Sequence, residues 1–243
     1  AAKRRAVTRA DVVICNSAGT QRDLVRVLGV QPSKCCVVHW GGEHLRRLHP
    51  SPRPYEAGAP YLLFVGDYRP PYKDFRFALD ALGSLPNRCA ADAVLIVATP
   101  FDPEDRCIDE WRALAQRDVR VMPACDDAEL AALYAGCSAF LYPSRYEGFG
   151  IPVLEALSFG APVVCSTAAA LMEVGGQAVY GFDPGSKMQF ADALERAMGD
   201  GRSDAAVTAR RQHAAAFSWN RAARGFEEAV RTALSPAGSR KHA

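Results

Sequence analysis

The fold of this chain is indicated most clearly by Tyr142-Pro-Ser-Arg-Tyr-Glu-Gly-Phe-Gly-Ile-Pro-Val-Leu-Glu-Ala-Leu-Ser-Phe-Gly160. An apolar strand is predicted to end near Tyr142, and a helix is predicted to begin at Pro152, because proline is favoured at the first helical position. Gly160 lies next to Ala161-Pro162 and predicts a left-handed glycine cap that ends this helix. The order of strand, glycine-rich loop and helix is typical of one unit of an α/β fold.

Short apolar runs alternate with helical stretches along the rest of the chain. Most of the runs are continuously apolar, which favours parallel strands covered on both faces. Strands separated by helices of about ten residues predict repeated βαβ units. The predicted fold class is therefore α/β, with a doubly wound, Rossmann-like parallel sheet. Strands are expected at residues 12–15, 36–39, 61–65, 94–98, 119–122, 139–142, 163–165 and 178–180, and helices at 17–28, 75–85, 104–116, 128–135, 152–159, 187–198 and 219–234.

A proline-rich segment divides the chain. Four prolines fall within residues 50–60, and because proline breaks helices and central strands, this segment is predicted to be a linker. The predicted organisation is a short N-terminal unit (residues 1–48), the linker (49–60), a doubly wound domain (61–217) and a C-terminal helix with a frayed tail (218–243).

Composition argues against several classes of protein. The 29 Lys and Arg residues nearly balance the 27 Asp and Glu residues and are spread along the chain, which argues against a nucleic-acid-binding protein. No apolar run approaches the ~20 residues of a membrane-spanning helix. The eight cysteines form no Cys-x-x-Cys pair, so a reducing cytoplasm is the expected location. The basic run Lys3-Arg4-Arg5 is expected to be a solvated helix face, with contact to a membrane or an anion as the alternative.

The loop before the predicted helix has the features of an anion site. Gly148 and Gly150 leave the backbone N–H groups around Phe149 open to close approach, and the helix N-terminus adds about half a positive charge, which suits a phosphate or diphosphate. Glu147 and Glu155 flank the loop. Glu155 is expected in the first helical turn, leaning back towards the loop and away from the core. The alternative is a tight glycine turn followed by a glutamate that complements the helix dipole.

A resemblance to a known family favours the ligand site. Glu147-Gly-Phe-Gly-Ile-Pro-Val-Leu-Glu155 resembles the signature of the retaining glycosyltransferases of family 4, in which two glutamates are separated by seven residues. Further stretches fit the same family in order and spacing: they are residues 10–17, 37–41, 63–66, 73–74, 130–134, 159–166 and 173–176. The resemblance implies the GT-B fold of two Rossmann-like domains. It makes this chain the C-terminal, donor-binding half with a remnant of the N-terminal domain.

The resemblance also implies roles for individual residues. Glu147 would contact hydroxyls of the transferred sugar, Glu155 would bind the nucleotide ribose, and the amides around Phe149 would meet the donor phosphates. A basic pair, Lys73 and Arg69, would grip the diphosphate. The implied catalytic residues are Glu147, Lys73 and Arg69, and the implied donor-binding residues are Gly66, Gly148, Phe149, Gly150, Leu154 and Glu155.

Two aromatic positions are expected to be structural. His39 ends an apolar strand where the family usually has Asn-Gly, and a packed histidine is a more common outcome there than a catalyst. Phe217-Ser-Trp219 resembles the start of the family's terminal helix, which crosses back onto the N-terminal domain, so its aromatic side chains are expected to pack.

The reaction implied by the resemblance is transfer of a hexose from a nucleotide sugar, such as GDP-mannose or a UDP-hexose, to a hydroxyl with retained configuration. The acceptor would be a sugar or a lipid-linked sugar. No metal is expected, because no Asp-x-Asp motif occurs and the cations and helix dipole would stabilise the departing diphosphate. Only about fifty residues precede the linker, whereas an acceptor domain needs on the order of 150. The chain alone is thus expected to bind without turnover, and any peripheral membrane contact is assigned to the acceptor lobe.

Two alternatives stay open on the sequence. The first is a non-catalytic nucleotide-sugar-binding module that regulates or pairs with another chain. The second is a GT-B epimerase or phosphorylase. The base and sugar of the donor are not specified by any residue pattern.

Overall fold

The computed structural model describes residues 2–47, 60–85, 90, 92–199 and 203–235. The N-terminal unit is one parallel βαβ crossing, in which Ile14 of the first strand lies opposite Cys36 of the second. The basic residues Lys3-Arg4-Arg5 lie on its first helix and are exposed, as a solvated helix face predicts. The elements of this unit are α1 (Ala2–Arg9), β1 (Val13–Cys15), α2 (Ala18–Leu28), the 3-10 turn η1 (Pro32–Lys34), β2 (Cys35–Val37) and the 3-10 turn η2 (His44–Arg47).

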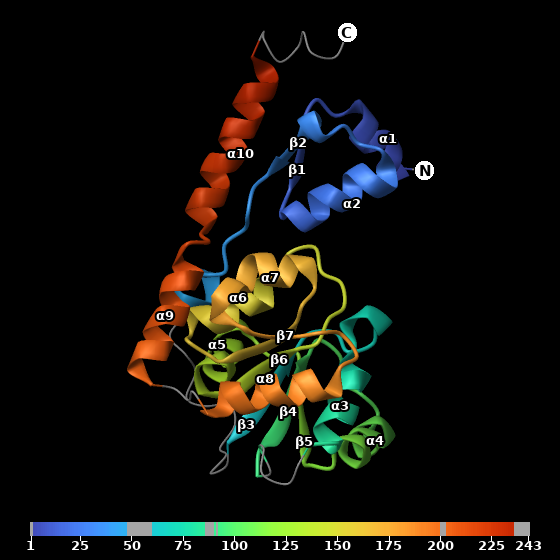
Figure 1. Ribbon diagram of the computed structural model, residues 1–243, viewed down its shortest axis with the longest axis vertical. Coiled ribbons are helices and arrows are strands. Elements are labelled where there is room, and N and C mark those ends of the chain that lie inside the picture. The colour runs from blue at the N-terminus through green and yellow to red at the C-terminus, as the bar shows by residue number, and fades with distance from the viewer. Residues whose placement is uncertain (1, 48–59, 86–89, 91, 200–202, 236–243) are drawn as a thin grey trace.

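The main domain is built on a six-stranded parallel sheet (Figure 1). Its strand order is β5-β4-β3-β6-β7-β8, and each pair of neighbours is parallel. The chain therefore winds outward from β3 in one direction and from β6 in the other, which confirms the predicted doubly wound topology. The strands are β3 (Tyr61–Val65), β4 (Val94–Thr99), β5 (Val119–Pro123), β6 (Ala139–Tyr142), β7 (Val163–Ser166) and β8 (Tyr180–Phe182).

Helices cover both faces of this sheet. On β3, Leu62 and Phe64 lie in the core that α3, α4 and α8 cover, whereas Leu63 lies in the core on the side of α5, α6, α7 and α9. Burial on both faces explains why the strands are continuously apolar. The helices are α3 (Phe75–Gly83), α4 (Asp105–Ala115), α5 (Asp127–Gly136), α6 (Ile151–Ser158), α7 (Ala169–Gly175), α8 (Lys187–Gly199), α9 (Asp204–Ala215) and α10 (Trp219–Leu234), with 3-10 turns η3 (Pro71–Lys73) and η4 (Gly176–Ala178).

Most predicted elements are confirmed to within a few residues, and Gly160 has the expected left-handed conformation, with φ 76°. The strand predicted at residues 178–180 lies two residues later, because a 3-10 turn occupies Gly176–Ala178 and β8 begins at Tyr180. Helices α7 and α9 were not predicted from the sequence. Helix α9 buries only Arg210 and Ala214, so it lacks the apolar period that reveals a helix. The predicted linker before Pro60 and the tail from residue 236 lie outside the described residues.

The last helix returns the chain to the N-terminal unit. In Figure 1, α10 rises past the segment that follows β2. The backbone N–H of Trp219 donates to Glu43 Oε1 at 2.8 Å. Gly225 packs so closely on Val38 that an added Cβ would lie 3.1 Å from Val38 Cγ1. Both ends of the described chain therefore contribute to the same body. Within the described ranges, no helix combines the length and apolarity needed to cross a membrane.

Candidate functional site

The topology of the sheet brings two loops together. Strands β3 and β6 are neighbours, and the chain leaves them in opposite directions. The carboxyl ends of two such strands are where doubly wound folds bind ligands. Arg145, after β6, ties the two loops to each other. Its backbone N–H donates to the Tyr72 carbonyl at 2.8 Å, and its Nε lies 2.6 Å from Asp74 Oδ2.

An ion pair joins the same two loops. Lys73 Nζ lies 2.7 Å from Glu147 Oε1, with side chains only 16% and 14% exposed. The lysine also donates to the Tyr142 hydroxyl at 3.0 Å. Burial, and after it the charge of Glu147, raises the pKa of Tyr142 above its usual value, so the phenol stays protonated and neutral. Two residues predicted for the site, one cation and one carboxylate, are thus brought into contact.

The loop that contains Gly148 and Gly150, here called the glycine loop, leads into helix α6. The backbone N–H groups where the loop meets the helix have no hydrogen-bond acceptor among the described residues. Gly150 is the N-cap residue of α6, with φ 117° and no side-chain cap, a conformation that favours glycine. Over the described ranges, the N–H groups of Phe149, Gly150 and Ile151 meet no hydrogen-bond acceptor. Three free donors at the positive end of a helix form the kind of surface that binds anions.

Glu155 does not lie where the sequence analysis placed it. Helix α6 begins at Ile151, so Glu155 lies beyond the first turn, and its side chain is buried instead of turned away from the core. A buried carboxylate needs hydrogen-bond partners, and two side chains supply them. The Tyr134 hydroxyl donates to Oε2 at 3.0 Å, and His44 Nε2 lies 3.1 Å from Oε1. The hydrogen bond to Glu155 outweighs burial and raises the pKa of His44.

Arg69 is placed differently from Lys73. Its Nε lies 2.9 Å from Asp67 Oδ1, and its guanidinium carbon lies 3.5 Å from the centre of the Phe101 ring. Its side chain is half exposed. Among the interactions of the described residues, none joins Arg69 to Lys73 or Glu147, so its role towards a diphosphate stays a prediction.

Gly66 and Leu154 hold structural positions beside the loops. Gly66 follows β3 with φ 128°, and its N–H donates to the Ala98 carbonyl at 2.9 Å, so the turn out of the strand uses a conformation that favours glycine. The Leu154 side chain is fully buried. Its predicted contact with a nucleotide is not tested by these positions.

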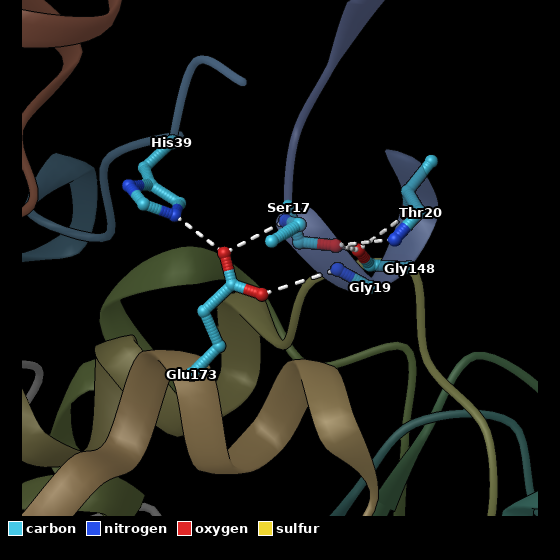
Figure 2. A network of polar contacts seen from close by, with 7 residues as sticks. Ser17, Gly19, Thr20, His39, Gly148 and Glu173 are labelled. Atoms are coloured by element: carbon cyan, nitrogen blue, oxygen red, sulfur yellow. Dashed lines mark hydrogen bonds and ion pairs between the residues drawn. The ribbon is translucent and has the colours of Figure 1, made fainter. Parts of the chain in front are cut away.

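A polar network connects the glycine loop to the N-terminal unit (Figure 2). The Gly148 carbonyl oxygen accepts from the hydroxyls of Ser17 at 2.7 Å and Thr20 at 2.9 Å. Glu173, on α7, accepts from the backbone N–H groups of Ala18 at 2.8 Å and Gly19 at 3.2 Å. The start of α2 is therefore held by residues of the main domain.

His39 packs against this network. Its Nε2 lies 2.7 Å from Glu173 Oε1, and its ring stacks on Phe149 and meets Phe217 edge-on, with centroids 6.0 and 5.5 Å away. Burial opposes the charge of Glu173, but the hydrogen bonds from Ala18, His39 and Gly19 outweigh burial and lower the pKa of its carboxyl. As predicted, the aromatic side chain of Phe217 packs.

Metal ligation has no candidate group in the described part of the chain, where no three or more His, Cys, Asp or Glu side chains are clustered to hold an ion. The expectation of chemistry without a metal therefore rests on the sequence alone.

A comparison with protein-family models shows which family this chain belongs to. The model of the family "Glycosyl transferases group 1" matches residues 59–200, which is more than half of the chain. This chain belongs to the glycosyl transferases group 1 family. The matched range contains both loops of the site and all residues predicted to act in it.

Two curated relatives illustrate how far the similarity extends. The chain is 35% identical over 162 residues to O-antigen chain mannosyltransferase B of Escherichia coli, covering 65% of this chain and 42% of that protein. It is 34% identical over 193 residues to D-inositol 3-phosphate glycosyltransferase of Frankia alni, covering 72% of this chain and 46% of that protein. The chain spans about half the length of these group 1 relatives.

Solved structures support the same fold. Sucrose-phosphate synthase from Thermosynechococcus elongatus aligns with a TM-score of 0.77 at 22% identity, over 95% of this chain and 60% of that chain. Anabaena HepE, in complex with UDP and glucose, aligns with a TM-score of 0.75 at 19% identity, over 93% of this chain and 64% of that chain. These likenesses show the GT-B fold, of which the doubly wound domain of this group 1 chain forms the C-terminal half.

For this group 1 chain, sequence reasoning missed the residues that hold the site in place. Ser17 precedes a helical run, which signals an N-cap, but its second contact is with Gly148, 131 residues away. Tyr134 and His44 come from α5 and η2 to the same carboxylate on α6. Contacts so distant along the chain follow from the fold and leave no local pattern.

Proposed function

We propose that this chain binds the nucleotide-sugar donor of a retaining hexosyltransferase in the crevice after β3 and β6. The observation that carries the proposal is the pair of Lys73 and Glu147 beside the free N–H groups at the start of α6. A cation and backbone donors suit a diphosphate, and a carboxylate suits sugar hydroxyls. One donor molecule would use all three.

The proposed chemistry is electrostatic. As the bond from the sugar to the diphosphate breaks, negative charge grows on the diphosphate, and Lys73 with the α6 N-terminus would stabilise it. Arg69 would join them by giving up its two hydrogen bonds to the carboxylate of Asp67. Glu147 would orient the sugar through its hydroxyls, and Glu155 would accept from the ribose. No step in this proposal requires a metal.

The names of two similar proteins support the donor and acceptor classes that we propose. One relative is a mannosyltransferase of an O-antigen chain, and one neighbour was solved with UDP and glucose. We therefore take GDP-mannose or a UDP-hexose as the donor and a sugar or lipid-linked sugar as the acceptor. The reaction would serve the synthesis of a cell-surface polysaccharide or glycolipid and would take place in the cytoplasm.

Positioning of the acceptor can account for ~7–11 kcal/mol of a barrier. An acceptor lobe would supply that positioning, so we expect the 243 residues alone to bind donor without efficient transfer.

Titration calorimetry of two variants tests the proposal. Glu155→Ala should weaken GDP or UDP and the matching nucleotide sugar alike, because it removes a ribose contact. Glu147→Ala should spare the free nucleotide and weaken only the nucleotide sugar, by roughly ten- to a hundredfold for a charged hydrogen bond. Unfolding curves without ligand control for the buried position of Glu155. Absence of binding by the unaltered chain to any nucleotide or nucleotide sugar at millimolar concentration would refute the donor site.

A further inference from the structure

The glycine loop is gripped from outside its own domain. The Gly148 carbonyl accepts two hydrogen bonds, from Ser17 Oγ at 2.7 Å and Thr20 Oγ1 at 2.9 Å. Both hydroxyls stand at the start of α2, in the N-terminal unit, and the loop belongs to the main domain (Figure 2). The loop next to the free amides is thus oriented by two side chains that precede the linker.

The two hydroxyls are themselves held in place. Ser17 is fully buried, and its Oγ accepts from the Thr20 backbone N–H at 2.9 Å, so its own proton is available to the Gly148 carbonyl. The carboxylate of Glu173 fixes the same helix end by accepting from Ala18 and Gly19. The start of α2 therefore presents its two hydroxyls to the loop from a rigid support.

Holding the Gly148 carbonyl also aims the next amide. The carbonyl of Gly148 and the N–H of Phe149 belong to one peptide group, and no described peptide bond is cis. In a planar trans peptide the C=O and N–H bonds point in opposite directions. The Phe149 N–H therefore points away from Ser17 and Thr20, and in the described residues it meets no acceptor.

We propose that Ser17 and Thr20 are positioning residues for donor binding. They lock the peptide between Gly148 and Phe149 so that its N–H faces the phosphates of the bound nucleotide. The inference deepens the proposed function and rests on it. It also makes the N-terminal unit part of the donor site, although that unit is not predicted to contact the donor.

Thr20→Val tests the inference, because valine keeps the shape of threonine and removes the hydroxyl, and Thr20 is not the N-cap of α2. Losing one neutral hydrogen bond to the carbonyl should weaken binding of GDP or UDP by about two- to tenfold. The matching guanosine or uridine, which has no phosphate, should bind as before. Thr20→Ser, which keeps a hydroxyl, should restore the nucleotide affinity.

An NMR spectrum provides a measurement that a loss of stability alone would not change. In protein labelled with ¹⁵N-phenylalanine, adding GDP or UDP should shift the Phe149 amide proton downfield, and Thr20→Val should reduce that shift. If the unaltered chain binds GDP or UDP but Thr20→Val leaves the affinity and the Phe149 shift unchanged, the positioning role is overturned and the donor site stands. Equal losses for nucleotide and nucleoside would also overturn it. If the unaltered chain binds no nucleotide, both proposals fall.

Discussion

Two helices begin beside Gly148, and their N-termini are completed in different ways. At α2 the chain provides its own acceptors, since Ser17 and Glu173 take the first backbone N–H groups. At α6 the cap residue is Gly150, the first turn has no acidic residue, and the N–H groups of Gly150 and Ile151 have no acceptor among the described residues. A carboxylate at a helix N-terminus is stabilising. Helix α2 gains this stabilisation from Glu173, whereas α6 lacks it.

The difference separates a helix end that serves the fold from one available to a ligand. Negative charge at α2 comes from within the chain, whereas at α6 the donor phosphates proposed above would supply it. The two ends are also linked, because α2 holds the Gly148 carbonyl. The N-terminus of α2, whose N–H groups are bonded, therefore supports the loop that leads into α6. Substitutions at the two helix ends should differ in their effects on stability and on nucleotide binding.

The largest expected effect follows from altering the open helix end. Gly150→Ala places a side chain on a backbone with φ 117°, and its Cβ would lie 2.8 Å from Leu171 Cδ2. The strained conformation costs about 1–3 kcal/mol, and the overlap with the buried Leu171 side chain adds to this cost. We expect a lower free energy of unfolding in denaturant titrations and loss of GDP or UDP binding in calorimetry.

Gly148→Ala is the matched control. An added Cβ at Gly148 would have Asn16 Nδ2 and Thr20 Oγ1 as its nearest neighbours, both at 3.7 Å, which is ordinary contact. We expect a smaller change in stability than for Gly150→Ala. If the two variants lose equal stability and equal affinity, the special conformation at the start of α6 is not what the site requires.

The fold of this chain could be predicted well because its signals are local. A strand that is buried on both faces, such as Val94–Thr99, is apolar along nearly its whole length. Such a run is visible in the sequence itself and indicates a parallel sheet. The order of the strands was not predicted, since it depends on which strands pair. Helix α9 was missed because its buried residues are one arginine and one alanine in place of large apolar residues.

The candidate site could be predicted only in part. Lys73 and Glu147 were expected to act at one centre, and they are in contact. Glu155 was expected to turn away from the core, but Tyr134 and His44 hold it in a buried position. The grip of α2 on Gly148 could not be anticipated, because only the packing of the N-terminal unit against the main domain brings those residues together.

The next largest effect should follow from altering the satisfied helix end. Glu173→Gln keeps the size of the side chain and removes the charge that faces the start of α2. We expect the free energy of unfolding to fall by about 1–2 kcal/mol at neutral pH. Glu227→Gln is the control, because Glu227 forms an exposed surface pair with Arg231 and its loss should change little.

The pH dependence sharpens this test. The pKa of Glu173 is lowered in the folded chain from an ordinary value of 4.5, so its contribution is fully present above about pH 4.5 and is lost as the pH falls through the folded value. The difference between the unaltered chain and Glu173→Gln should therefore shrink in acid. A difference that is constant down to about pH 3 would argue against a charge-based cap.

The smallest expected effect concerns the carboxylate that α6 does carry. Glu155 lies beyond the first turn and is paired with His44, so it does not complete its own helix end. The hydrogen bond to Glu155 raises the pKa of His44 above its ordinary 6.5. Burial opposes this rise, and the charges of Glu155, Asp127 and Glu43 add to it. A raised pKa stabilises the fold fully below pH 6.5, and this stabilisation is lost as the pH rises through the folded value. Because the histidine is 42% exposed, His44→Gln should cost less than ~1 kcal/mol at about pH 5.5 and almost nothing at about pH 9. Denaturant titrations of both proteins at both pH values measure this difference, and a cost that grows with pH would show that His44 does not neutralise Glu155.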